Sequence, residues 1–212
     1  EFYGVMSISA HLKKYGYQSE VLFGSKEEIV ESIRREKPSC IAFSCMSIQW
    51  KWAKELSTYI KGSGIEIPII LGGIHASMFP EDAISHPDID VVCINEGELP
   101  MLEFMQALEK GENYSTIDNL WVRKSGEVVK NCARPKMTAE ELNDLPFADR
   151  ALYKKYDHFV KYPFEIFVGS RGCPFKCTFC EIPEINDMYG GKSVYYVDPI
   201  RFVDEIQEVK DK

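Results

Sequence analysis

The 212-residue sequence lacks a hydrophobic run long enough to cross a lipid bilayer. A membrane-spanning helix needs roughly 20 apolar residues, whereas runs such as Ile67 to Leu71 are far shorter. We therefore expect no membrane span and a cytoplasmic protein. The absence of a signal peptide adds little to this expectation, because the chain starts at Glu1 rather than at a methionine.

Blocks of like charge are also absent. The net charge is −8, and the acidic and basic residues, which together make up 27% of the chain, are interspersed. A protein that holds a phosphate backbone usually carries a basic stripe, so we expect no nucleic-acid partner. The hydrophobic share of 45% is ordinary for a globular protein.

A fourth metal ligand is missing from the most distinctive part of the chain. Cys173, Cys177 and Cys180 have the spacing C-x3-C-x2-C, and neither Cys nor His follows them. A structural zinc site normally takes four such ligands, and disulfides are disfavoured because the chain has seven cysteines, an odd number. Iron–sulfur clusters usually have four thiolate ligands, so a cluster held by these three keeps one iron open. We favour this cluster and keep zinc as the alternative.

The first 110 or so residues alternate between helical and strand patterns. Repeated units of this kind predict a parallel sheet covered by helices on both faces. Ser25 and Glu28 have the spacing of a capping box, which predicts the start of a helix. The expected strands are 18–23, 40–44, 67–71 and 90–94, of which 40–44 and 67–71 read as buried on both faces, and the expected helices include 5–15, 25–33, 48–60, 80–85 and 101–108.

The remaining pattern is less regular. The sequence pattern of residues 112–160 predicts a packed connector that contains a β-hairpin with strands 119–123 and 127–130. Residues 164–168 read as a short strand that leads into the cysteine loop, and residues 199–212 read as a helix. Because helical patterns stand at both ends of the chain, we expect a fragment that is cut from a longer protein and that lacks its first strand.

The cysteine spacing, with an aromatic residue just before the last cysteine, resembles the signature of the radical S-adenosylmethionine enzymes. The resemblance implies that Cys173, Cys177 and Cys180 hold a 4Fe-4S cluster whose open iron binds S-adenosylmethionine. It also implies that Phe179 lies against the adenine of this cofactor. Reductive cleavage of S-adenosylmethionine would then produce a 5′-deoxyadenosyl radical.

The loops after the predicted strands resemble those of the cobalamin-binding domain. In that family a motif S-x-L is followed by a pair of glycines, and here Ser44-x-Met46 is followed by Gly72 and Gly73 after 25 residues. Tandem glycines suit a flat nucleotide base that slides against backbone, and serine hydroxyls suit the nucleotide tail. The resemblance implies cobalamin contacts from the loops that follow three strands: Ser44, Met46, Ser47, Gly72, Gly73, His75, Glu96 and Gly97.

Two other metal assignments stay open. The family motif D-x-H-x-x-G would place its cobalt-ligating histidine near Glu1, where this chain has none, so we expect no histidine lower ligand. His75 is an alternative cobalt ligand, although a histidine beside a glycine turn is more often a hydrogen-bonding loop residue. The remaining alternative is a second cluster at Cys40, Cys45 and Cys93, whose spacing does not resemble that of the methylthiotransferases.

Together the motifs resemble those of the cobalamin-dependent radical S-adenosylmethionine enzymes. This resemblance implies an α/β fold with three parts: a doubly wound, Rossmann-like cobalamin-binding domain at 1–111, a connector at 112–160, and the first part of a truncated (β/α) barrel at 161–212. It implies methyl transfer to an unactivated carbon of a small molecule or natural product, with a flavodoxin or ferredoxin as the reductant. A radical cyclase and a non-catalytic cobalamin-binding module with a structural metal loop are the alternatives. The fragment alone is expected to be inactive, and no catalytic residue is predicted.

Overall fold

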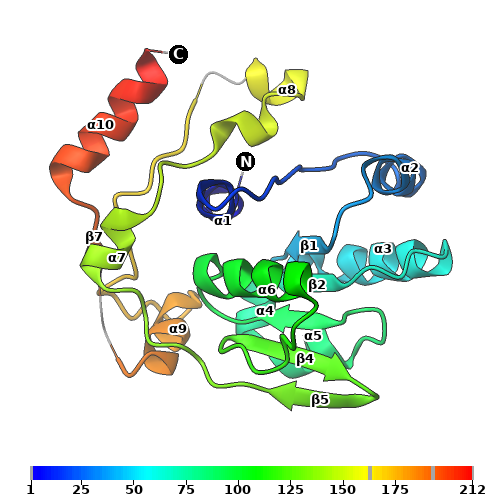
Figure 1. Cartoon of the computed structure of the whole chain (residues 1–212). Coiled ribbons are helices and arrows are strands. Elements are labelled where there is room, and N and C mark those ends of the chain that lie inside the picture. The colour runs from blue at the N-terminus through cyan, green and yellow to red at the C-terminus, as the bar shows by residue number, and fades with distance from the viewer. Residues whose placement is uncertain (1, 162–163, 192–193, 212) are drawn as a thin grey trace. The chain divides into compact units, whose positions relative to one another are not determined.

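The computed structural model describes residues 2–161, 164–191 and 194–211, which form two compact units. One unit is Val21–Arg134, and the other combines Glu1–Glu20 with Pro135–Lys212. The helices and strands of both are drawn in Figure 1. The domain boundaries predicted from the sequence follow the family resemblance and stay a prediction.

The unit Val21–Arg134 is built on a five-stranded sheet in the order β1-β2-β3-β4-β5. The strands β1 (Ile41–Ser44), β2 (Ile69–Gly72) and β3 (Val91–Cys93) are parallel to their neighbours, and Ser44 lies opposite Gly72 in the register. Helices connect these three strands, as the alternating pattern predicted. The Rossmann-like α/β class is therefore confirmed.

The predicted hairpin is present, but it is part of the five-stranded sheet and not only a connector between domains. Strands β4 (Leu120–Lys124) and β5 (Glu127–Lys130) pair antiparallel, and β4 also pairs antiparallel with β3. The hairpin thus extends the sheet instead of standing outside it. The reason is burial, because Leu120 and Val122 alternate with more exposed residues and bury one face of β4.

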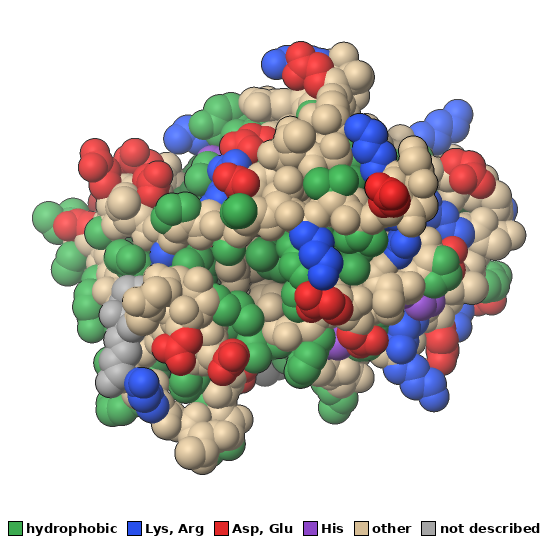
Figure 2. All heavy atoms as spheres, turned by 90° about the horizontal axis from the view of Figure 1, so that it is seen from below, with side chains coloured by type: hydrophobic (Ala, Val, Ile, Leu, Met, Phe, Trp, Pro, Cys, Tyr) green, Lys and Arg blue, Asp and Glu red, His purple; other side chains and the backbone are tan. Residues whose placement is uncertain are grey.

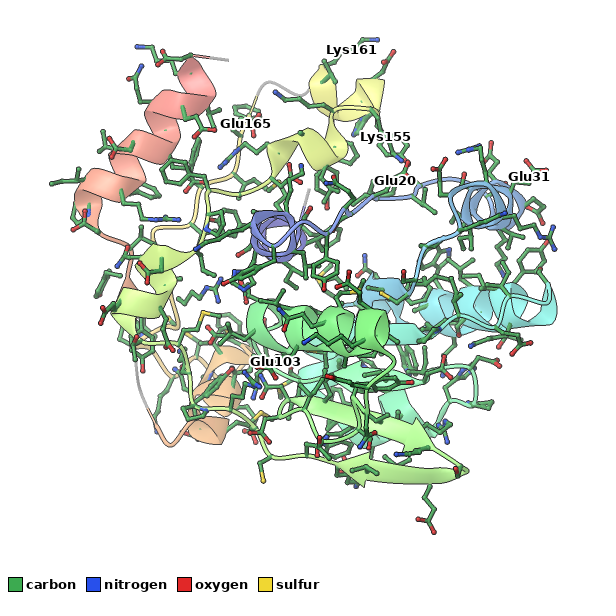
Figure 3. The ribbon with its side chains drawn as sticks, viewed as in Figure 1. Glu20, Glu31, Glu103, Lys155, Lys161 and Glu165 are labelled. Carbon is green, nitrogen blue, oxygen red and sulfur yellow. The ribbon has the colours of Figure 1, made fainter. Side chains whose placement is uncertain are left out.

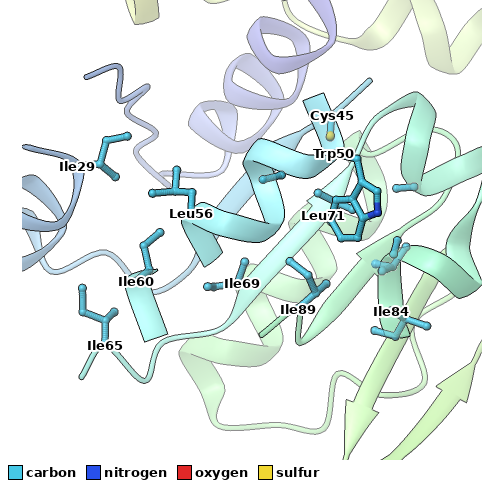
Figure 4. Close-up of a cluster of buried hydrophobic side chains, with 14 of the residues drawn as sticks. Ile29, Cys45, Trp50, Leu56, Ile60, Ile65, Ile69, Leu71, Ile84 and Ile89 are labelled. Atoms are coloured by element: carbon cyan, nitrogen blue, oxygen red, sulfur yellow. The ribbon is translucent and has the colours of Figure 1, made fainter. Parts of the chain in front are cut away.

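Helices pack on this sheet through apolar faces. The helices of this unit are α2 (Lys26–Glu36), α3 (Trp50–Gly62), α4 (Ile74–Met78), α5 (Pro80–Ser85) and α6 (Glu98–Lys110), and a short 3-10 helix, η1 (Ser47–Gln49), precedes α3. Figure 4 shows Trp50, Leu56 and Ile60 of α3 against Ile69 and Leu71 of β2. Burial of these side chains is the main stabilising contribution to this unit.

The predicted helix start at Ser25 is confirmed. The Ser25 hydroxyl accepts a hydrogen bond from the Glu28 N–H at 3.3 Å, and the Glu28 carboxylate accepts one from the Ser25 N–H at 2.7 Å. This reciprocal pair satisfies two N–H groups that a helix start leaves without intrahelical partners.

Two strand predictions in this part of the chain were wrong. Residues 18–23, all of them described, form no strand, although Leu22 packs against the hydrophobic core. β1 is not buried on both faces, because Ala42 and Ser44 are exposed while Ile41 and Phe43 are partly buried. Both differences have one cause: no strand of the described residues pairs with the outer side of β1, which therefore forms an edge of the sheet.

The second unit consists mainly of short elements. These are α1 (Tyr3–Lys14), α7 (Ala139–Asp144), the 3-10 helix η2 (Arg150–Tyr153), α8 (Asp157–Val160), β6 (Ser170–Arg171), α9 (Ile182–Met188), β7 (Tyr195–Tyr196) and α10 (Pro199–Lys210). An ion pair between Glu20 and Lys155, both labelled in Figure 3, links two segments of this unit. The helix predicted at 199–212 is confirmed to Lys210, and Lys212 lies outside the described residues.

The strand predicted at residues 164–168 was wrong. The paired segment begins later, at Ser170, and its partner β7 runs antiparallel to it. Phe164 and Ile166 are 69% and 43% exposed, so the apolar pattern of this stretch does not correspond to a buried strand.

A buried ion pair ties three segments of the second unit together. Arg150 Nη1 lies 2.8 Å from Oε1 of Glu205, a residue of α10 that is 1% exposed. The same guanidinium reaches a Glu165 carboxylate oxygen at 3.2 Å and donates to the Ile166 carbonyl oxygen at 2.8 Å. Its ring neighbour is Phe167, at 4.5 Å from the guanidinium carbon to the ring centroid.

Candidate functional site

The loops that follow β1, β2 and β3 lie at one edge of the sheet, because parallel strands end on the same side. Ser44 is the last residue of β1 and Gly72 is the last residue of β2, and the two are register partners. In open α/β sheets ligands bind at this carboxyl edge. The structure thus brings the predicted cobalamin contacts together within the unit Val21–Arg134.

The two adjacent glycines have different roles. Gly73 has a φ of +89°, and a Cβ atom there would lie 2.6 Å from the Cys45 backbone nitrogen and 2.9 Å from the Cys45 carbonyl oxygen. The protein's own backbone therefore requires glycine at this position. A Cβ atom at Gly72 would have its nearest contact at 3.8 Å, an ordinary van der Waals distance. Only Gly72 has room for a side chain, so only Gly72 leaves space that a ligand could use.

His75 is buried, and its ring contacts other side chains of the protein. Its Nδ1 atom lies 3.1 Å from the Ser47 hydroxyl, and its Nε2 atom lies 3.3 Å from a carboxylate oxygen of Asp82. The ring also stacks against Trp50, with 4.9 Å between the centroids. Burial lowers the pKa of His75 below its usual value, and the Asp82 carboxylate opposes this shift in part. The structure therefore places His75 as a residue that holds the two loops together.

The other residues predicted on the first loop face outward. Ser44, Met46 and Ser47 are exposed, and Met46 retains 45% of its surface. The next residue, Ile48, is 88% exposed. Two hydroxyl groups beside apolar side chains form a surface that can contact both polar and apolar parts of a large organic ligand.

The loop after β3 contains Glu96 and Gly97 and is held by two asparagines. Asn119 is 2% exposed, has a φ of +69°, and donates its side-chain N–H to the Glu96 carbonyl oxygen at 3.1 Å. Asn95 has a φ of +62° and donates its backbone N–H to the Ser77 hydroxyl at 2.8 Å. The side-chain oxygen and nitrogen of Asn95 are buried without a hydrogen-bond partner.

Neither asparagine was predicted from the sequence. Nothing local distinguishes Asn95 or Asn119 from a surface loop residue, although asparagine is among the few residues that tolerate a positive φ. Their role depends on partners that are 18 and 23 residues distant in the chain. The side-chain amide of Asn95, which has no hydrogen-bond partner, offers a donor and an acceptor at the carboxyl edge of the sheet, where Gly72 also lies. Such a group fits a ligand that is rich in amides, such as cobalamin.

Three of the four cysteines of the sheet unit, Cys40, Cys45 and Cys93, are in apolar surroundings, whereas Cys132 is exposed. Burial raises the pKa of the Cys40 and Cys45 thiols to about 11, and burial raises that of Cys93 to about 12. A metal binds the thiolate form, which burial disfavours here. The alternative of a second cluster stays a prediction that only metal analysis can test.

The cysteine loop lies in the other unit. Cys177 is exposed, Cys173 and Cys180 are partly buried, and all three thiols are free. Phe179 is 91% exposed. No group of three potential metal ligands converges within the described residues. The donor set fits an iron–sulfur cluster by its chemistry, since thiolates are the usual ligands, but the thiols are not drawn together around a common centre. The predicted position near Glu1 for a cobalt ligand lies outside the described residues.

Figure 2 shows basic and acidic side chains interspersed over the face in view. Among the described residues, every helix is too short or too polar to traverse a bilayer.

Comparisons with known proteins agree with the cobalamin-binding motifs. The B12 binding domain family matches residues 3–105. An uncharacterized methyltransferase of Pyrococcus horikoshii is 29% identical over 72% of this chain and 33% of its own length. The anaerobic magnesium-protoporphyrin IX monomethyl ester cyclase of Rubrivivax gelatinosus is 26% identical over 96% of this chain and 38% of its own length. The cytidylyl-2-hydroxyethylphosphonate methyltransferase of Streptomyces wedmorensis is 24% identical, with coverages of 99% and 48%.

Two solved structures share the fold over 99% of this chain. The cobalamin-dependent S-adenosylmethionine radical enzyme OxsB has a TM-score of 0.77 at 19% identity, and this chain covers 29% of it. The radical S-adenosylmethionine methyltransferase TsrM from Kitasatospora setae has a TM-score of 0.73 at 16% identity, and this chain covers 42% of it. The chain spans less than half the length of each of these relatives and structures.

Proposed function

We propose that this chain is the cobalamin-binding and cluster-binding part of a cobalamin-dependent radical S-adenosylmethionine methyltransferase that acts on an unactivated carbon. The observation that carries the proposal is a conjunction. A B12 binding domain match over residues 3–105 and the C-x3-C-x2-C motif at 173–180 occur in one chain. The curated relatives include methyltransferases that align over most of this chain.

The carboxyl edge of the sheet would hold cobalamin. The exposed Ser44 and Ser47 hydroxyls would hydrogen-bond the nucleotide tail, and Gly72 would let the flat base approach the backbone. Asn95 would pair its unsatisfied amide with an amide of the ligand, since a buried polar group without a partner is costly. His75 is buried and bonded to Ser47, so it would orient that hydroxyl and would not bind cobalt.

The cysteine loop would hold the cluster through Cys173, Cys177 and Cys180. A 4Fe-4S cluster bound there would supply the electron that cleaves S-adenosylmethionine. Phe179 would offer its exposed ring to the adenine. The task of the protein residues is to hold the three thiolates and to orient the bound cofactors, since cofactors carry the difficult chemistry.

A radical cyclase is the second candidate. The observation in its favour is that cyclases acting on magnesium-protoporphyrin IX monomethyl ester align with 96% and 93% of this chain. A non-catalytic cobalamin-binding module with a structural metal loop is the alternative from another class. The substrate, a small molecule or natural product, and the flavodoxin- or ferredoxin-type reductant are also proposals.

The test uses the full-length protein, purified without oxygen after expression with added cobalamin. We expect iron, sulfide and cobalamin in the purified protein, and 5′-deoxyadenosine after S-adenosylmethionine and dithionite are added. With the methyl group of S-adenosylmethionine labelled, transfer of label to cobalamin supports methyl transfer, and its absence with deoxyadenosine formed supports the cyclase. A protein that binds cobalamin and metal but leaves S-adenosylmethionine intact contradicts both enzymes and favours the module.

A further inference from the structure

One buried side chain contacts the cysteine loop from the helix that follows it. Asn186 belongs to α9 and is 2% exposed. Its side-chain nitrogen donates a hydrogen bond to the Cys173 carbonyl oxygen at 2.8 Å. The backbone carbonyl oxygen of Asn186 accepts a hydrogen bond from the Gly191 N–H at 2.9 Å, just after the end of α9. Asn186 thus connects the start of the cysteine loop to the end of the following helix.

The rest of the loop is much more exposed. Phe175 and Phe179 are 68% and 91% exposed, and Cys177 is exposed. Within residues 173–180 the Cys180 N–H donates a backbone hydrogen bond to the Cys177 carbonyl oxygen at 3.2 Å. Because the three thiols do not converge among the described residues, the loop has to rearrange before it can hold a cluster.

The side-chain oxygen of Asn186 is also informative. It is buried and accepts no hydrogen bond in the described part of the chain. An unpaired buried acceptor costs free energy, so a rearrangement that brings an N–H donor to it is favoured. The backbone N–H groups of the cysteine loop are donors of the required kind, and one end of this loop is already bonded to the same amide.

We infer that Asn186 is a positioning residue for the cluster site. It holds Cys173 in place through the carbonyl oxygen while Cys177 and Cys180 close around the metal, and its free oxygen accepts an N–H of the closed loop. This inference rests on the proposed function, since it assumes that the three cysteines bind a cluster. Asn186 touches no reacting atom and acts only through the loop.

The experiment compares variants of the full-length protein after anaerobic reconstitution with iron and sulfide. Asn186→Leu removes the hydrogen bond to the Cys173 carbonyl oxygen and also the free side-chain acceptor, at similar volume. Asn186→Asp keeps the shape but removes the N–H donor. Asp187→Ala is the matched control, because Asp187 is the exposed neighbour on the same helix. The readouts are iron content, the rate at which a chelator removes the cluster absorbance, the electron paramagnetic resonance spectrum of the reduced cluster, and the melting temperature.

We expect the Asn186 variants to lose the cluster about fivefold faster than the wild type, a factor that corresponds to one net hydrogen bond. We also expect an altered resonance spectrum in both variants and wild-type behaviour in Asp187→Ala. If the wild type forms no cluster, the proposed function fails, and the inference fails with it. If the wild type forms a cluster but both variants keep its release rate and spectrum, only the inference is overturned, even where their melting temperatures fall.

Discussion

At the residue scale, the site depends on side chains whose roles are set by distant partners. Gly73 approaches the Cys45 backbone, His75 bonds Ser47, and Asn119 holds the Glu96 carbonyl oxygen. The sequence motif placed Gly72 and Gly73 in one loop and assigned both to the ligand. The structure separates them, because only one has space at its Cβ position.

This difference predicts opposite outcomes for two alanine substitutions. Gly73→Ala should unfold the protein or lower its melting temperature strongly, since a Cβ atom would lie 2.6 Å from backbone and the φ of +89° is strained for alanine. Gly72→Ala should leave the melting temperature close to the wild-type value and weaken cobalamin binding. Differential scanning fluorimetry and cobalamin titration of the 212-residue chain measure the two effects.

Each of the two alanine variants has an outcome that would contradict its assigned role. If Gly72→Ala binds cobalamin as well as the wild type, the nucleotide base does not lie against this glycine. If Gly73→Ala is as stable as the wild type, the close approach to Cys45 does not restrict this position.

At the element scale, predictions that depend on residues close in the sequence were confirmed. Two strand predictions, which depend on a pairing strand elsewhere in the chain, were wrong. The helix over Pro80–Ser85 and the hairpin formed as predicted, because turns, caps and helical hydrogen bonds join residues that are close in sequence. Residues 18–23 and 164–168 have strand composition but no pairing partner among the described residues. β-propensity reflects packing and pairing more than an intrinsic backbone preference.

The link between η2 and α10 gives a second prediction. Glu205→Ala should lower the free energy of unfolding by about 3 kcal/mol, because it leaves the buried Arg150 guanidinium without one of its partners. Glu205→Leu combined with Arg150→Met should recover much of this loss, since no buried charge then remains unpaired. Urea unfolding of the 212-residue chain measures both changes.

An exposed ion pair serves as the control for this prediction. Lys161 and Asp157 form a pair whose side chains are 76% and 90% exposed, so Asp157→Ala should have no measurable effect on unfolding. A Glu205→Ala variant that unfolds at the same urea concentration as the wild type would show that the buried pair contributes nothing to stability.

At the scale of the whole molecule, the two predicted cofactor sites belong to different compact units. The residues predicted for cobalamin, from Ser44 to Gly97, all lie within Val21–Arg134, whereas the three cysteines lie in the unit that contains Pro135–Lys212. Each unit has its own buried contacts, so a change confined to one loop of one unit should leave the other site intact.

The third prediction follows from this division. Replacement of Cys173, Cys177 and Cys180 by serine together should abolish iron binding by the full-length protein and leave its cobalamin affinity unchanged. Iron analysis and cobalamin titration of the same sample measure the two outcomes. A loss of cobalamin affinity in this variant would mean that the cysteine loop contributes to the cobalamin site.

The sequence by itself determined the α/β class, most helices, the hairpin and the cysteine motif, since these depend on periodicity, capping and short spacings. Only the tertiary structure decided that β1 is an edge strand, that Gly73 serves the protein's own backbone, that His75 is buried, and that Asn186 holds Cys173. The physical reason is common to all four. Each depends on atoms that folding brings together, or fails to bring together, from separate segments of the chain, and no local pattern records which segments those are.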